Sequence, residues 1–596
     1  MANSPSIEDV QPAIWREKHC GIRPPSSESV VSFIEWFIVL LINGAIIGFG
    51  VWKSRETTRT VDWFLAAKGL PWWIVGLSMF ATAVDSGDYV AIAGASYRNG
   101  LSYITPWWLG LSVGWLLVAY VVFLPMYRNG MFTNAEYLEA RFGPVTRILS
   151  VFIQIQYRTN VLANVAYSLY LTFSITTDWG ANAWWLVVGI AAGAAVYTAS
   201  GGLKSVAITD AMQSVVMLSA AIVLWFIIYR AVGGWDGLEE KLQAAETGPD
   251  IIYAMKHIGG NPDPDAPPIL VLFGWVVFLT AYCVVNHSQS MRMLASRSEW
   301  DLKMAAAAAA LVTAGVMWFN ITLGIFGRGL FPGLESGDSV FPLMVRDYLM
   351  PASSVLSGIV IAGLLAGGIS TYDSIGSALA AVFTRDLYAR FLVKYADDRH
   401  YLWVSRIATV AVIAVSFVYI PFLDGGMVKL YVKLVGITAV PLFVVYMMGI
   451  LTIVHRRAGI IGLFAGMLSG ISRLLCDVMA LDVSPYWTNS WWGNLWTILI
   501  TASAMVLASL VLGWARREDV GRLLFQSNSE PAEQGGEGES DAPQTWLEKT
   551  RAEVPRMPVQ PENLPTSGIG QIMSQPLLWA GVTLIVVSAL NLFVFW

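Results

Sequence analysis

The stretch ATAVDSGDYV, residues 81–90, lies within a long apolar segment and carries two aspartates. A helix that spans a membrane needs about 20 apolar residues, and a carboxylate at its centre costs roughly 2.5–3.5 kcal/mol even on the most permissive scale. Asp85 and Asp88 are separated by Ser86 and by Gly87, and glycine has poor helix propensity. Unwound backbone at membrane depth is tolerated only where it is buried in protein or lines a cavity. We therefore expect residues 81–90 to interrupt a membrane helix at a functional site.

The composition is that of a polytopic membrane protein. Of 596 residues, 56% are hydrophobic and 13% are charged, and the mean hydropathy is +0.57. The formal net charge of −5 and the scattered basic residues argue against nucleic-acid binding. Three separated cysteines do not suggest a disulfide framework or a zinc site. No nucleophile–base pair suggests an enzyme, no filter sequence suggests a channel, and the first thirty residues do not resemble a signal peptide.

Apolar runs of spanning length predict an all-α protein with about fourteen transmembrane helices. The expected segments are 30–52, 71–96, 105–127, 146–174, 182–200, 205–230, 269–296, 303–329, 352–384, 400–422, 427–454, 458–480, 491–515 and 575–596.

Loop charges predict the orientation. Lys and Arg are concentrated after the first, third, ninth and eleventh spans, including Arg55 and Arg59, whereas loops 175–181, 423–426 and 481–490 have almost none. By the positive-inside rule both termini lie outside the cell membrane. We expect an extracellular tail over 1–29, a transporter domain over 30–515, a disordered cytoplasmic linker over 516–574 and a final helix over 575–596.

The ninth span places oxygen atoms on one helical face. In AGGISTYDSIGS (366–377), Gly367, Ser370, Thr371 and Ser374 follow helical spacing, and Asp373 flanks them. Hydroxyl, carboxylate and carbonyl oxygens are the ligands that hard cations such as sodium require. The alternative is that the hydroxyls bond back to carbonyls of their own helix.

Two further ionisable residues, Asp210 and Arg158, fall at membrane depth. Such residues face a protein interior, a partner or water, although a structural ion pair is an alternative for any one of them. The seventh span also has a polar centre, YCVVNHSQS (282–290), five spans after the interrupted second span. Broken helices at corresponding positions predict two five-helix repeats, about 71–230 and 269–454, with a binding site between them.

Several motifs in order resemble the sodium:solute symporter family, which includes sodium/glucose cotransporters and the proline and sialic acid symporters. They are DWFLAAKGLPWW (62–73), TNAEYLEARF (133–142), GGLKSVAITDAMQ (201–213) and FTRDLY (383–388).

The resemblance implies a LeuT-type fold with a 5+5 inverted-repeat core over spans 2–11, to which spans 1, 12, 13 and 14 are added. It also implies a main sodium site formed by the carbonyls of Ala81, Val84 and Gly367 and the hydroxyls of Ser370 and Thr371.

A second cation site in some members corresponds here to Asp210 with Ser370, Asp373 and Ser374. Those members have serine at the position of Asp373, so this aspartate either strengthens a cation site or holds a proton.

The substrate positions depart from the sugar cotransporters. Those proteins carry glutamine, glutamate and asparagine where this chain has Asp88, Trp107 and Ala83, whereas an aromatic gate is kept at Tyr282. The expected substrate residues are Asp85, Asp88, Tyr103, Trp107, Trp108, Arg158 and Tyr282. The alternative for Trp107 and Trp108 is that they belong to an aromatic belt at the membrane interface.

Carboxylates and aromatic faces suit a sugar or polyol, but they also suit an ammonium group through cation–π contact. If Arg158 pairs with Asp85 or Asp88, a zwitterion fits as well. We expect a non-enzymatic symporter that imports a small organic solute, most simply a sugar or polyol, with sodium. The alternatives are an amino acid, a betaine- or choline-like solute, a carboxylate, or a membrane sensor without transport.

Overall fold

The computed structural model describes most of the chain, and the regular elements of the described part are helices. The described residues are 31–54, 60–177, 179–245, 247–260, 266–425, 427–481, 483–525, 544–554, 558–561, 564–565 and 567–596. Within them the only β-type pairing is an isolated bridge between Leu70 and Ser296. The expected tail over 1–29 and the loop residues Arg55 and Arg59 lie outside this part.

Twelve helices of the described part are long and apolar enough to cross a membrane. The two other expected segments are also helical: one is the broken pair α4–α5 and the other is the long helix α10. Both contain buried polar residues, which lower their hydropathy. The all-α membrane architecture is confirmed, and the count of fourteen spans remains a prediction.

The first repeat begins with a broken helix whose first half, α4, packs between helices α12 and α17. Its third long element, α10, begins with Pro144 in the first turn, where a missing N–H costs nothing. The elements are α4 (Trp72–Ala83), α5 (Ser86–Asn99), α6 (Leu101–Ile104), α7 (Pro106–Leu117), η3 (Val118–Val122), α8 (Phe123–Arg128), α10 (Pro144–Thr176), α11 (Ala183–Ser200) and α12 (Leu203–Val232).

The second repeat also begins with a broken helix. Serine N-caps start its two longest helices: Ser298 accepts from the N–H of Asp301, and Ser353 accepts from that of Leu356. The elements are α15 (Pro268–Val285), α16 (His287–Leu294), α17 (Glu299–Leu330), α19 (Ser354–Val382), η8 (Phe383–Leu392), α20 (Asp398–Ser416), η9 (Phe417–Gly425) and α21 (Met427–Leu451).

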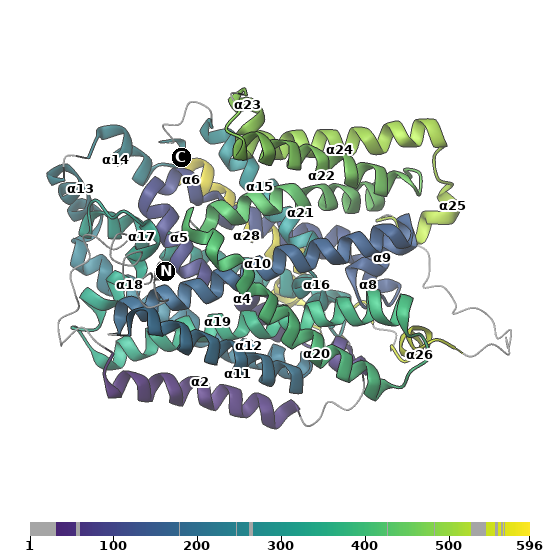
Figure 1. Ribbon diagram of the computed structural model, residues 1–596, viewed down its shortest axis with the longest axis horizontal. Coiled ribbons are helices and arrows are strands. Elements are labelled where there is room, and N and C mark those ends of the chain that lie inside the picture. Colours follow the sequence, from purple (N-terminus) through teal and green to yellow (C-terminus); the bar gives the residue numbers. More distant parts are fainter. Residues whose placement is uncertain are drawn as a thin grey trace, which may run out of the picture.

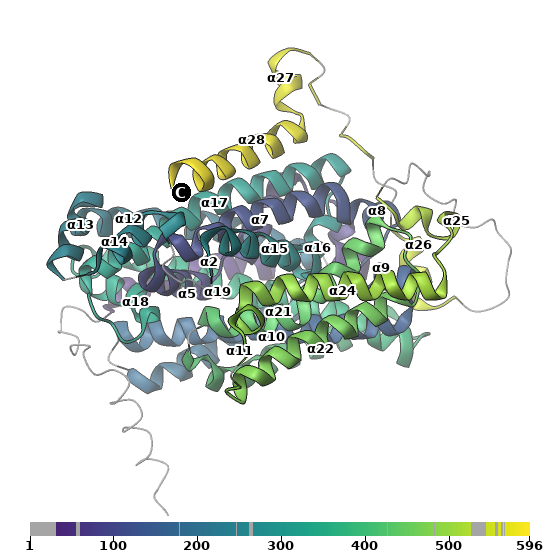
Figure 2. The same ribbon diagram turned by 90° about the horizontal axis from the view of Figure 1, so that it is seen from above.

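Four further long helices surround the repeats. Figure 1 shows α2 along one edge of the bundle and α22 with α24 along the opposite edge, and in Figure 2 helix α28 lies over α17 and α7. Their bounds are α2 (Phe33–Ser54), α22 (Ala458–Val478), α24 (Ser490–Leu512) and α28 (Pro576–Ala589), which continues as η11 (Leu590–Val594).

Short helices connect these elements. They are α3 (Thr60–Leu65), η2 (Ala66–Lys68), α9 (Asn134–Phe142), η4 (Gly180–Asn182), α13 (Gly234–Ala244), α14 (Pro249–Lys256), η5 (Ile258–Gly260), η6 (Gly337–Ser339), α18 (Val340–Met344), η7 (Val345–Leu349), α23 (Pro485–Thr488), α25 (Arg517–Val520), η10 (Gly521–Leu523), α26 (Trp546–Ala552) and α27 (Gly568–Met573).

The first and last described residues lie at the same end of the bundle. The N–H of Val31 donates to the carbonyl of Thr176 at 3.2 Å, at the end of α10. The carbonyl of Trp596 lies 3.2 Å from Nδ1 of His257, beside α14. Helices α9, α25 and α26 lie at the opposite end (Figure 1). The geometry agrees with an even number of crossings, and which end faces the cytoplasm remains a prediction.

The expected linker over 516–574 contains described helices as well as residues outside the described part, among them 526–543. Helix α26 packs against the bundle through the buried side chain of Trp546. The ring of Trp546 stacks on Tyr401 with centroids 4.0 Å apart, and its indole N–H donates to Asp398 at 2.7 Å.

Glu136 in α9, the first acidic residue of the motif TNAEYLEARF, contacts three arginines at the end of the bundle where α9 and α26 lie. Its carboxylate accepts from Arg551 of α26 at 2.7 Å and from Arg385 at 3.5 Å, and Arg147 lies 3.9 Å away. Although burial alone raises the pKa of Glu136, the three guanidinium groups outweigh it and lower that pKa to about 2. The ionised glutamate therefore links the C-terminal segment to the helix bundle.

Candidate functional site

The membrane helix that contains both aspartates is broken at Val84 and Asp85. Helix α4 ends at Ala83, the next two residues are extended, and α5 begins at Ser86. The N–H of Asp88 donates to the carboxylate of Asp85 at 3.0 Å, and the N–H of Asp85 donates to the carboxylate of Asp88 at 3.1 Å. This reciprocal capping box starts α5 inside the bundle. The first role of the two aspartates is thus to satisfy backbone donors that the break exposes.

Gly87 does not form the break, although its helix propensity suggested that position. It lies in the first turn of α5, next to α10. A Cβ atom at Gly87 would lie 2.8 Å from Oδ1 of Asp85 and 3.3 Å from the carbonyl carbon of Asn164. The glycine is therefore required for the close approach of α10 to the capping box.

The residues expected to form the main sodium site lie together where α19 crosses the break. The Ser370 hydroxyl oxygen lies 3.1 Å from the Ala81 carbonyl oxygen and 2.7 Å from Oδ1 of Asp210. A hydroxyl has one hydrogen and can donate to only one of them. When it donates to the carboxylate, the Ser370 and Ala81 oxygens keep lone pairs facing the same space. Oxygens bound at about 2.4 Å to one hard cation are spaced by roughly 3 Å, so this pair suits two ligands of a single ion.

The other three expected ligands border the same space. The hydroxyl of Thr371 is buried and has no hydrogen-bond partner among the described residues. A Cβ atom at Gly367 would lie 3.4 Å from the backbone nitrogen of Ser86, so α19 touches the break at that glycine. Val84 is extended at the end of α4, which frees its carbonyl from the helical pattern. The structure brings all five residues together, and their role as sodium ligands remains a prediction.

At the position of the expected second cation site, Asp210 is paired with an arginine that was not expected from the sequence. Nη2 of Arg292, on α16, lies 2.7 Å from Oδ2 of Asp210, and both side chains are fully buried. Ser78 accepts from Nε of Arg292 and donates to Asp210, each at 2.6 Å. Arg292 also donates to Ser374. The sequence signal was a lone basic residue at the end of a broken span, HSQSMR (287–292).

Asp373 lies on the other side of this cluster. One carboxylate oxygen accepts from Thr198 of α11, while the other is buried and has no hydrogen-bond partner among the described residues. Ser374 links the cluster to α4 through a 2.9 Å contact with the Thr82 hydroxyl. Asp210, Asp373 and Ser374 are therefore neighbours, with an arginine already among them.

The second broken helix lies against the first. Helix α15 ends at Val285, and Asn286 caps α16 by accepting from the N–H of Ser288 at 3.0 Å. The Gln289 amide donates to the carbonyl of Met79 on α4 at 3.1 Å. The polar centre of the seventh span is thus a helix break, as predicted, and the two breaks belong to corresponding first helices of the two repeats.

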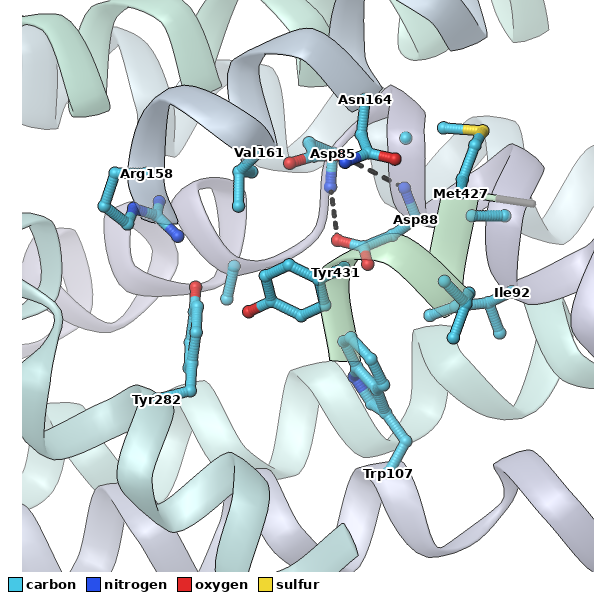
Figure 3. Close-up of a pocket in the computed structure, with 14 residues that line it drawn as sticks. Asp85, Asp88, Ile92, Trp107, Arg158, Val161, Asn164, Tyr282, Met427 and Tyr431 are labelled. Atoms are coloured by element: carbon cyan, nitrogen blue, oxygen red, sulfur yellow. Dashed lines mark hydrogen bonds between the residues drawn. The ribbon is translucent and has the colours of Figure 1, made fainter. Parts of the chain in front are cut away.

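A cavity opens beside the first break (Figure 3). It encloses about 520 Å³, including the part that is open to solvent. Five expected substrate residues line it: Asp85, Asp88, Trp107, Arg158 and Tyr282. The cavity is therefore centred on the segment that also borders the expected sodium ligands.

Two expected substrate residues, Tyr103 and Trp108, do not line this cavity. The ring of Tyr103 packs edge-on against Trp491, with centroids 5.7 Å apart. Trp108 stacks on Trp318 with centroids 5.8 Å apart. Both form aromatic packing next to the pocket.

Nine other residues line the cavity and were not among the expected substrate residues. Among them, Asn164 comes from α10, and Met427, Val428 and Tyr431 come from the start of α21. The Tyr431 ring lies between Arg158 and Asp88 in Figure 3. No local pattern marks the three positions on α21, because that helix is apolar and meets the cavity only through the tertiary fold.

The arrangement of two broken helices beside a cavity agrees with the comparison to known proteins. The sequence profile of the Sodium:solute symporter family matches residues 63–470. The chain belongs to this family. Sodium is accordingly the co-transported ion, and the protein is a sodium-coupled solute symporter with a LeuT-type fold.

Similar proteins include cotransporters that are named for myo-inositol and for glucose. The chain is 28% identical over 469 residues to the sodium/myo-inositol cotransporter 2 of Bos taurus, covering 72% of this chain and 68% of that protein. It is 27% identical over 477 residues to the sodium/glucose cotransporter 4 of Danio rerio, covering 74% and 71%. The solved structure of a Na+-coupled sialic acid symporter in a substrate-bound outward-open state matches with a TM-score of 0.68 at 19% identity. It covers 81% of this chain and 99% of that one, and shares the fold.

Proposed function

We propose that this symporter imports a small polyhydroxylated solute, of the sugar or polyol class, together with sodium by alternating access. Two features support the solute class: the relatives named for myo-inositol and glucose, and a cavity that combines carboxylate acceptors with aromatic rings. Carboxylates accept hydrogen bonds from hydroxyl groups, and aromatic faces pack against the apolar faces of sugar rings.

The observation that carries the coupling mechanism is the position of Asp85. It lines the solute cavity and directly follows Val84, whose carbonyl we assign to sodium. Sodium bound by Ala81, Val84, Gly367, Ser370 and Thr371 would hold the break of α4–α5 against α19 and shape the cavity beside it. Rocking of the helix bundle around this fixed site would then expose both ligands to the other side.

We propose that a second cation reaches Asp210, Asp373 and Ser374 only after the guanidinium of Arg292 moves, since Arg292 already pairs with Asp210 and donates to Ser374. The unpartnered oxygen of Asp373 supports a cation or a proton at that place.

The proposed setting is the cell (plasma or inner) membrane, with both termini outside and the α9 end in the cytoplasm. The basic residues Arg147, Arg385 and Arg390 at that end support this orientation. Inward transport then gains about 2.3 kcal/mol per sodium for each 100 mV of membrane potential.

Uptake into proteoliposomes tests the proposal. An imposed inward sodium gradient is expected to concentrate a sugar, a polyol or a close derivative, whereas a matched potassium gradient is not. If no solute of a panel that includes glucose, myo-inositol, sugar acids and proline accumulates with sodium, the proposed function is wrong.

A further inference from the structure

The cavity contains a buried arginine that has no hydrogen-bond partner among the residues that the structure describes. Arg158 on α10 is 1% exposed and lines the pocket. No hydrogen bond or ion pair joins its guanidinium to any described residue, and Nε and Nη2 are buried without a partner there. Its guanidinium carbon lies 5.7 and 5.5 Å from the ring centroids of Tyr157 and Tyr282.

Each of the other buried arginines of the described part donates at least one hydrogen bond to the protein, although single nitrogens of Arg141, Arg385 and Arg473 stay without a partner there. Arg141 donates to three carbonyls at the end of α21. Arg292 pairs with Asp210, and Arg147 pairs with Asp386 and Glu139. Leaving a buried charge without a partner is costly, so a solitary guanidinium is retained where a ligand completes it.

The two aspartates of the pocket do not complete Arg158. Asp85 and Asp88 satisfy each other's backbone N–H groups, and neither forms an ion pair with the arginine. Figure 3 shows Arg158 on one side of Tyr431 and Asp88 on the other, with the Tyr282 hydroxyl directed toward Arg158. The cavity thus has a basic end and an acidic end, separated by aromatic rings.

We infer that the transported solute is a sugar acid, whose carboxylate binds Arg158 and whose hydroxyl groups face Asp88 and the aromatic rings. This inference rests on the proposed function and narrows its solute class. A planar guanidinium matches a carboxylate in both charge and geometry, because two parallel N–H groups reach its two oxygens. A neutral sugar or polyol offers Arg158 hydroxyl oxygens but no carboxylate that could accept two parallel hydrogen bonds from it.

The test measures sodium-driven uptake of glucuronate and gluconate beside glucose, myo-inositol and proline. The wild type is expected to concentrate a sugar acid. In the Arg158→Gln variant, the concentration of that acid for half-maximal uptake is expected to rise by roughly tenfold to a hundredfold, the usual worth of a hydrogen bond to a charged group. Arg158→Lys keeps the positive charge but not the two parallel N–H donors. Its rise in the concentration for half-maximal uptake is therefore expected to be smaller than that of Arg158→Gln.

A binding measurement keeps the test independent of variant folding. With sodium present, glucuronate or gluconate is expected to raise the thermal unfolding midpoint of the wild type in detergent, and glucose at the same concentration is not. Arg473→Gln is the matched control, because Arg473 is a buried arginine on α22 that lies outside the cavity and donates to Thr497. Its sugar-acid affinity is expected to stay that of the wild type.

Two results would overturn the inference. The first leaves the proposed sodium-coupled symport intact, and the second contradicts that function as well. If glucose, myo-inositol or proline accumulates with sodium while no sugar acid accumulates or stabilises the protein, the sugar-acid assignment is wrong and sodium-coupled symport stands. If none of the five solutes accumulates, both the proposed function and this inference fail.

Discussion

Replacing Thr371 by alanine should weaken sodium binding more than it weakens the fold. The Thr371 hydroxyl is buried near the Asp85 carboxylate and forms no hydrogen bond of regular geometry with a described residue, so its removal breaks no such bond. If it binds sodium, the change removes one of five expected oxygen ligands. A hydrogen bond to a charged group is worth about 1.5–3 kcal/mol, and we take the same scale for an ion–hydroxyl contact. At 1.4 kcal/mol per decade, the sodium concentration for half-maximal uptake should rise by roughly tenfold or more.

The assay is the sodium dependence of solute uptake into proteoliposomes at a fixed solute concentration. Thr371→Ser keeps the hydroxyl and should stay close to the wild type. Ser377→Ala is a control two turns along the same helix, because the Ser377 hydroxyl bonds back to the carbonyl of Asp373 at 2.7 Å. An unchanged sodium dependence in Thr371→Ala, with normal protein stability, would refute the assignment of Thr371 as a ligand.

Three further predictions concern stability, measured by thermal unfolding in detergent. Arg292→Gln should cost about 3–5 kcal/mol because it leaves the Asp210 carboxylate buried without its cation, and adding Asp210→Asn should recover part of the loss. Gly94→Ala should cost about 1–3 kcal/mol, since a Cβ atom there would lie 2.8 Å from backbone atoms of η6, whereas Gly193→Ala, which has open space, should not destabilise. Glu136→Gln should destabilise at pH 7 by up to roughly 3 kcal/mol, because the pKa of Glu136 is lowered to about 2 in the folded protein.

The pH dependence of that last variant follows from the sign of the shift. A carboxyl group whose folded pKa lies below its unfolded value stabilises the protein above the unfolded value, about 4.3, and loses this contribution as the pH falls toward 2. The wild type should therefore lose more stability than Glu136→Gln between pH 4.5 and pH 2. Parallel losses in the two proteins would contradict the ion-pair account, as would a single Arg292→Gln variant as stable as the wild type.

Local patterns in the sequence were sufficient to predict the apolar helices and the two helices that are broken. Charged and polar residues in apolar spans are costly, so Asp85 and the polar centre around Asn286 marked the two broken helices. The sequence did not indicate which residue unwinds. Gly87 was favoured by propensity, but the capping box of Asp85 and Asp88 places the break two to three residues earlier, through hydrogen bonds within the bundle.

The partners of the buried charges required the tertiary structure. The sequence placed Asp210 and Arg158 at membrane depth. It shows each of them only as a charged residue in an apolar span, and so does not indicate that Asp210 pairs with Arg292 while Arg158 has no such partner among the described residues. Tyr431 was missed for a similar reason, because its helix is apolar and reaches the pocket only from the second repeat.

By itself, the sequence determined that the chain crosses a membrane many times, where its helices are weak and which residue types are available for sodium. These properties depend on the cost of transferring each segment into lipid, which neighbouring residues settle. Only the tertiary structure decided which charged side chains form ion pairs with one another. It joins Arg292 to Asp210 and leaves Arg158 open to the cavity, because electrostatic pairing acts over a few ångströms between helices far apart in the chain.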